Sequence, residues 1–79
     1  MYIDIKVRDI NNKIFTLKVK KLDIILHVKN MIFDWTGFHP DTQYLSFGGK
    51  KLEDKYKIWD YDIRTDSLIN ILIWQVGGF

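Results

Sequence analysis

Two segments near the start of the chain alternate strictly between apolar and polar side chains. In MYIDIKV, residues 1–7, the apolar side chains on one face are Met1, Ile3, Ile5 and Val7. In IFTLKVK, residues 14–20, the inward side chains are Phe15, Leu17 and Val19. Because side chains alternate between the faces of a strand, this period of two predicts two half-buried strands. Asn11 and Asn12 tolerate positive φ, but no glycine lies between the strands, so we expect a hairpin with a loop of several residues.

The period changes in LDIILHVKNMIFDWTGFHP, residues 22–40. Apolar residues recur at helical spacing at Ile25, Val28, Ile32 and Trp35. This spacing predicts one helix of about three turns. Asp23 is the predicted N-cap, and Gly37, with Pro40 after it, is the predicted stop. The other side of the helix carries Leu26, Met31 and Phe33, which either pack on the sheet rim or form a contact surface.

The second half of the chain predicts short strands around a glycine turn. TQYLSFGGKKLED contains a strand, a turn at Gly48-Gly49 and a second short strand. Residues 55–67 are irregular, with Ile58 and Ile63 inward, and LINILIWQV is a last strand. The order strand, strand, helix, strand, short strand, strand in 79 residues predicts one α+β domain. Its single helix should cover one face of a mixed sheet.

Composition narrows the class of partner. The net charge of +2 is too small to predict nucleic acid or an anionic membrane as a partner. The chain has no cysteine and no segment near the roughly 20 apolar residues of a membrane helix. We expect a monomer in the cytoplasm or nucleus.

No pattern predicts a catalytic site, a metal site or a cofactor. His27 and His39 are the only histidines, and their spacing is not that of metal ligands. Ser46 and Ser67 lie outside any nucleophile motif. Gly48-Gly49 lacks the lysine-serine pair and following helix of a phosphate-binding loop. The sequence therefore favours a protein that is not an enzyme.

The motifs, in their order along the whole chain, resemble those of ubiquitin and the ubiquitin-like modifiers. The strongest stretch is FGGKKLEDKYKIWDYDI, with MYIDIKV before it and Gly77-Gly78 after it. On the helix the matching residues are Val28, Lys29 and Ile32, and the first turn contains a short insertion. The resemblance implies a β-grasp fold over residues 1–74, with a mixed sheet of four to five strands packed on one helix, and a flexible tail over 75–79.

The resemblance also implies a core and two structural contacts. The core positions it assigns are Ile3, Ile5, Phe15, Leu17, Val19, Ile25, Val28, Ile32, Leu45, Leu52, Ile58, Ile63, Ile69 and Ile71. Lys29 would pair with Asp54, and the hydroxyl of Tyr61 would hold the same loop. Both contacts would satisfy polar atoms that packing removes from water.

Gly77-Gly78 is the candidate reactive end. A chance Gly-Gly at one given site has a frequency of about one in 200. In ubiquitin-like modifiers the last glycine carboxylate is adenylated with ATP, passes to an enzyme cysteine and ends on a target lysine. Here Gly78 is bonded to Phe79, so the resemblance implies a precursor from which a protease removes Phe79. The implied partners are activating and conjugating enzymes, this protease and target proteins.

The surface positions depart from the family pattern. The apolar patch through which ubiquitin binds partners matches Ile10, Ser46, Asn70 and Leu72. Ser46 replaces a central aliphatic residue, which removes about 2 kcal/mol of apolar burial. Ordinary ubiquitin receptors should therefore bind weakly.

Recognition by the activating enzyme should also change. The positions that replace arginines or flank them are Tyr44, Trp74, Gln75 and Val76. An activating enzyme that pairs its own carboxylates with arginine would find no arginine here, and its carboxylates would stay unpaired. Packing of Tyr44 on Trp74 would instead offer an aromatic surface to a dedicated partner.

Four lysines stand at family chain-linkage positions, while Thr65 occupies another; these lysines are Lys6, Lys13, Lys29 and Lys50. Solvated surface charge is the alternative role for them. For the whole chain the alternative is a ubiquitin-like interaction domain that is never conjugated and that is released from a polyprotein precursor.

Overall fold

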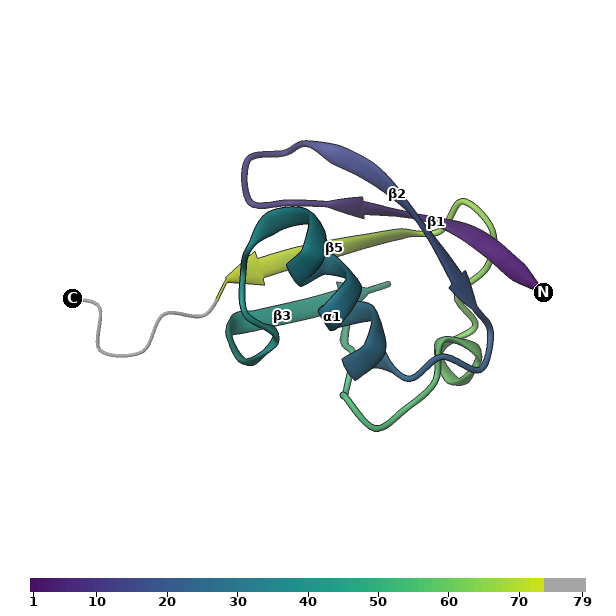
Figure 1. Ribbon diagram of the computed structural model, residues 1–79. Helices are drawn as coiled ribbons and strands as arrows, with labels where there is room; N and C mark the ends of the chain where they lie inside the picture. Colours follow the sequence, from purple (N-terminus) through teal and green to yellow (C-terminus); the bar gives the residue numbers. More distant parts are fainter. Residues whose placement is uncertain (74–79) are drawn as a thin grey trace.

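The computed structural model describes residues 1–73 and places one helix against one face of a five-stranded sheet (Figure 1). The strands are β1 (Tyr2–Arg8), β2 (Ile14–Lys20), β3 (Gln43–Phe47), β4 (Lys50–Lys51) and β5 (Leu68–Ile73). The helix α1 spans Ile25–Thr36, and two 3-10 helices, η1 and η2, span Pro40–Thr42 and Ile58–Tyr61. This arrangement confirms the β-grasp fold.

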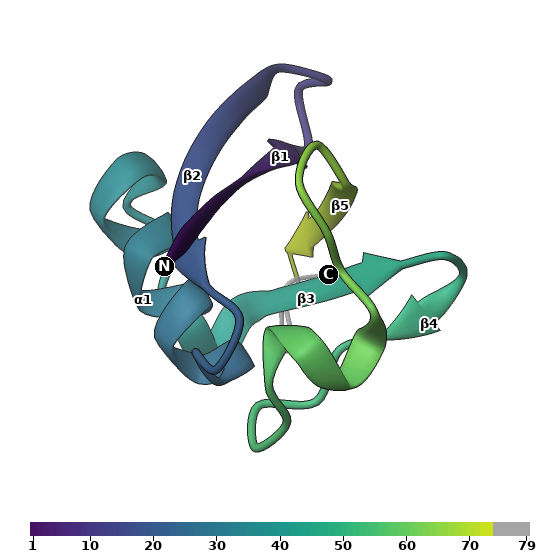
Figure 2. The ribbon, with the colours of Figure 1, turned by 90° about the vertical axis from the view of Figure 1, so that its right-hand side faces the viewer.

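The first and last strands lie side by side at the centre of the sheet. The strand order is β2-β1-β5-β3-β4. β1 is antiparallel to β2 and parallel to β5, and β3 is antiparallel to both β4 and β5 (Figures 1 and 2). Because parallel neighbours need a long crossover connection, most of the chain, including α1, lies between β1 and β5.

The core fills the space between the sheet and α1. The strand register stacks inward side chains on one another: Ile5 is opposite Leu17, and Leu45 is opposite Ile71. Every core residue implied by the resemblance is buried except Phe15, which is half-buried at the edge of the core. The alternation in the first two strands therefore predicted the buried face correctly.

Two apolar residues lie outside the core although the period predicts them on the buried side. Met1 is 99% exposed, because β1 begins only at Tyr2. Trp35 is 63% exposed, because it lies at the flank of the buried stripe of α1. Its ring stacks on Phe15, with 5.3 Å between the ring centroids.

The prediction that Asp23 caps α1 is wrong. The N-cap residue is Ile24, whose side chain cannot accept a hydrogen bond. The Asp23 carboxylate instead accepts a hydrogen bond of 2.8 Å from the backbone N–H of Lys20. The N–H of Ile25 donates to the carbonyl of Tyr56 at 2.8 Å. A backbone N–H group at the start of α1 thus finds its hydrogen-bond acceptor in a distant loop rather than in a local side chain.

The two contacts that the resemblance implies, one by Lys29 and one by Tyr61, are both confirmed at the loop of residues 53–56. Leu26 donates its backbone N–H to the carbonyl of Asp54 at 3.1 Å. The amine of Lys29 lies 2.6 Å from the Asp54 carboxylate. The hydroxyl of Tyr61 accepts a hydrogen bond of 2.8 Å from the backbone N–H of Glu53. The first two contacts hold Asp54 against α1, and the third holds Glu53 against η2.

Positive φ angles occur where the sequence predicts turns. Gly37 ends α1 at φ 80°, and its N–H donates to the Phe33 carbonyl at 2.8 Å. Gly48 and Gly49 have φ of 58° and 80°, the pair of values that a tight hairpin between β3 and β4 requires. Asn12 takes φ 68° in the loop between β1 and β2.

Candidate functional site

The candidate partner-binding positions on β3 and β5 come together on the face of the sheet that points away from α1. The register sets Ser46 opposite Asn70 and Tyr44 opposite Leu72. These four residues alternate with the buried Leu45 and Ile71 side chains, so they point outward. We call them the outer patch: Tyr44, Ser46, Asn70 and Leu72.

The outer patch is apolar at one end and polar at the other. Leu72 is 60% exposed, and Tyr44 is also exposed, whereas Ser46 and Asn70 are half-buried. The amine of Lys51 lies 5.4 Å from the centroid of the Tyr44 ring. An apolar partner therefore has less surface to cover than a continuous aliphatic patch would offer.

Sequence reasoning did not include Lys51 in this patch. The signal was present, because β4 pairs with β3 and the register sets Ser46 opposite Lys51. A lysine over an exposed tyrosine adds a positive charge beside Tyr44, at the apolar end of the patch.

Ile10 lies in the loop that follows β1, next to the strand position where Arg8 pairs with Asn70. Its side chain is exposed. The loop is held by Asp9, whose carboxylate accepts hydrogen bonds from the backbone N–H groups of Asn11 at 2.8 Å and Lys13 at 2.9 Å. Ile10 is thus presented on an ordered turn beside the outer patch.

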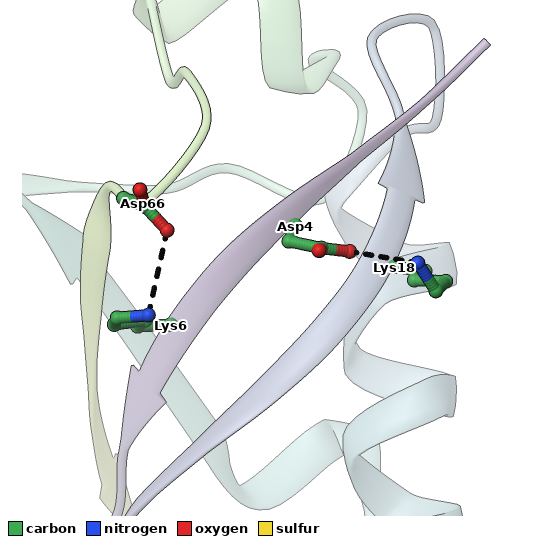
Figure 3. Close-up of polar contacts among 4 residues, drawn as sticks. All are labelled: Asp4, Lys6, Lys18 and Asp66. Atoms are coloured by element: carbon green, nitrogen blue, oxygen red, sulfur yellow. Dashed lines mark hydrogen bonds and ion pairs between the residues drawn. The ribbon is translucent and has the colours of Figure 1, made fainter.

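The four candidate linkage lysines differ in environment. The side chain of Lys29 is only 9% exposed, and its amine is paired with Asp54. The amine of Lys6 lies 3.4 Å from the Asp66 carboxylate (Figure 3). Lys13 and Lys50 are exposed and form no ion pair within residues 1–73. An incoming carbonyl therefore has the easiest access to Lys13 and Lys50.

The candidate conjugation and processing residues lie outside the described residues. They are Gly77, Gly78 and Phe79. Three of the four candidate residues for recognition by the activating enzyme also lie there: Trp74, Gln75 and Val76. The expected packing of Trp74 on Tyr44 falls there too. In the sequence, these residues follow directly after β5, which ends at Ile73.

The two histidines are both exposed. His27 lies on α1, and the ring of His39 stacks on Phe33 with 4.9 Å between centroids. Within residues 1–73, no three His, Cys, Asp or Glu side chains gather in a way that could hold a metal ion. None of the helices described over that range has the length and apolar character needed to cross a bilayer.

Comparison with known proteins agrees with this geometry. A model of the ubiquitin family matches residues 3–75. The NEDD8-like protein RUB1 of Saccharomyces cerevisiae is 26% identical over 74 residues, which cover 94% of this chain and 96% of RUB1. The ubiquitin-like protein NEDD8 of Dictyostelium discoideum is 28% identical over 74 residues, which cover 94% of this chain and 96% of that protein.

Human Ubiquitin D is more similar over a shorter stretch. It is 37% identical over 62 residues, which cover 78% of this chain but only 38% of Ubiquitin D. The chain therefore spans well under half the length of this relative. The two relatives that match over nearly their full length are named as NEDD8-like or ubiquitin-like proteins and not as enzymes, in agreement with the expectation from the sequence.

Proposed function

The chain belongs to the ubiquitin family, and on that premise we propose that it is a protein modifier joined to target lysines through Gly78 once Phe79 is removed. The observation that carries the proposal is Gly77-Gly78, which follows closely after β5 in a chain aligned with nearly the full length of RUB1. Glycine suits such an end because it has no side chain to obstruct a narrow catalytic channel.

Conjugation would require four chemical steps. A protease hydrolyses the bond between Gly78 and Phe79, which separates Phe79 and any residues after it and leaves a carboxylate on Gly78. The carboxylate attacks ATP, forming an acyl-adenylate and releasing pyrophosphate. An enzyme cysteine thiolate then displaces AMP to form a thioester. A target lysine amine finally displaces the thiolate and forms the isopeptide bond.

The enzymes that serve this chain should differ from those of ubiquitin. Tyr44 stands where ubiquitin has arginine, and Trp74 does the same in the tail. A carboxylate placed to pair with arginine would be desolvated beside an aromatic ring and left without a partner. We expect a dedicated activating enzyme that accepts an aromatic surface.

The decisive experiment is a thioester assay. Three forms are incubated with ATP and a panel of candidate activating enzymes, those of ubiquitin and NEDD8 among them: the full chain, the chain ending at Gly78, and the chain ending at Gly78 with Gly78→Ala. A thioester, seen as a band that a thiol reductant removes, should form only with the second. Thioester formation by the full chain would contradict the need for processing.

Processing has its own test in the native cell. Mass spectrometry of the recovered protein should show termini at Gly78, both free and joined to lysine. If only intact Phe79 termini are found, and no activating enzyme yields a thioester, the modifier proposal fails.

One observation favours a second candidate, a ubiquitin-like interaction domain that is not conjugated. The chain aligns with only 38% of Ubiquitin D, so a domain of this kind also occurs within a longer protein. In that case the outer patch is the functional part, and Gly78→Ala leaves every binding activity unchanged.

A further inference from the structure

An open pocket of about 390 Å³ lies where β1 begins, and its lining residues are Met1, Ile3, Lys21, Trp59, Arg64 and Thr65. We call it the Trp59 pocket. The N-terminus and the far end of β5 lie at opposite ends of the molecule (Figure 1). The pocket is therefore remote from the end of β5.

The backbone of Trp59 is held in place beside this pocket, although the side chain is exposed. The residue is 53% exposed and belongs to η2. Its backbone N–H donates to the carbonyl of Lys21 at 2.9 Å, and the N–H of Ile58 donates to the carbonyl of Asp23 at 2.9 Å. These bonds hold η2, and with it the backbone of Trp59, against the loop before α1, so the segment that carries the indole is in place before a ligand binds.

The cations beside Trp59 are not fully neutralised. The Lys21 amine lies 4.8 Å from the centroid of the Trp59 ring and forms no ion pair within the described part of the chain. The Arg64 guanidinium lies 3.0 Å from the carboxylate of Asp62. The pocket thus offers one free positive charge and one shared charge beside an apolar floor that includes Ile3.

We propose that the Trp59 pocket binds an acidic peptide segment of a partner protein. One aliphatic side chain of the peptide lies against Ile3 and the indole of Trp59, and a neighbouring carboxylate pairs with Lys21. Exposed tryptophans and arginines of this kind are the residues that most often carry binding energy at interfaces.

A peptide fits the pocket better than a nucleic acid does. Asp60 and Asp62 follow Trp59 closely in the chain and would repel a continuous phosphate backbone. A single carboxylate can lie beside Lys21 and avoid them. The pocket also has one aromatic ring, whereas nucleic-acid grooves commonly stack successive bases on several rings.

The test is an NMR titration of the full chain, labelled with ¹⁵N. The probe is a short capped peptide of glycine and serine that carries one central leucine next to one glutamate. Amide shifts should concentrate at Lys21, Trp59 and Arg64, with a dissociation constant on the order of 100 μM for so small an interface. Because no step involves Gly78, the result is independent of the thioester assay.

Variants with matched controls make the test specific. Trp59→Ala and Lys21→Glu should each weaken binding at least about tenfold, while Trp59→Phe should retain most of it. Trp35→Ala, at another exposed tryptophan, and Lys55→Glu, at another exposed lysine, should leave the dissociation constant unchanged.

Three results would overturn the proposal. The first is that the control variants weaken binding as much as the Trp59 and Lys21 variants do. The second is that a peptide whose leucine is replaced by glycine binds as tightly as the original peptide. The third is that a single-stranded oligonucleotide binds more tightly than the peptide.

Discussion

The side chains on the two faces of β5 are under different physical constraints. On the inner face, Ile69 and Ile71 are buried against the core. On the outer face, Asn70 and Leu72 meet solvent beside β3. The inner side chains must fill a closed volume at high density, which permits few alternatives. The outer side chains fill no closed volume, so substitutions there should cost the fold less.

The largest expected effect lies on the inner face. Ile71→Ala should lower the free energy of unfolding by about 2–5 kcal/mol, because it removes buried methylenes and leaves a cavity that the sheet and α1 cannot close. Urea denaturation followed by circular dichroism measures the change. Leu72→Ala, one residue further along the same strand, is the matched control and should cost at most about 0.5 kcal/mol. Similar losses for both would break the contrast between the faces.

The next effect concerns binding by the outer patch. Ser46→Ile should strengthen binding of a standard ubiquitin-binding helix by about tenfold or more, because it restores apolar area at the centre of the patch. Isothermal titration calorimetry on the original chain and the variant measures the gain. Micromolar-range binding by the original chain would show that Ser46 does not weaken the patch.

A smaller effect is expected at the loop that satisfies the start of α1. Tyr61→Phe removes the hydroxyl that accepts the Glu53 N–H, and the loss should be about 1 kcal/mol of unfolding free energy. The Tyr56 hydroxyl makes no side-chain hydrogen bond within residues 1–73, so Tyr56→Phe should be close to neutral. Hydrogen exchange at Glu53 should rise in the first variant alone.

The smallest effect should come from the ion pairs on the outer face. Lys18 lies 3.2 Å from the Asp4 carboxylate across β1 and β2 (Figure 3). Both side chains are well exposed, so solvent and salt screen the attraction. Lys18→Gln should change the free energy of unfolding by less than about 0.5 kcal/mol, with little difference between low and high salt. A loss above about 1 kcal/mol would show that the outer face also stabilises the fold.

The fold could be predicted because its inner face obeys two simple periods. Alternation placed Ile5 and Leu17 in the core, and helical spacing placed Val28 and Ile32 there. The period does not predict burial correctly beyond the end of a helix or strand, because no neighbouring element covers a side chain there. Met1 is the example, because it lies just before the first residue of β1.

Long-range polar contacts were harder to predict. Asp23 has the right chemistry and position for a cap, but a carbonyl from a distant loop satisfies the helix N–H of Ile25 instead. No local pattern reports such a partner, and only the resemblance to a family supplied the pair of Lys29 with Asp54. The Trp59 pocket was missed for the same reason, since β1, the loop before α1 and η2 meet there only in the folded chain.

The central place of β5 has a consequence for synthesis of the chain. Without this strand the sheet separates into the β1–β2 hairpin and the β3–β4 pair, because β5 alone joins them. Lys6 and Leu68, paired in the parallel ladder, are far apart in sequence, and such contacts form late and slowly. A nascent chain on the ribosome therefore cannot complete its sheet until β5 has emerged. Gly77-Gly78, through which we propose conjugation, follows that strand, so translation reaches these glycines only after all five strands of the sheet have been made.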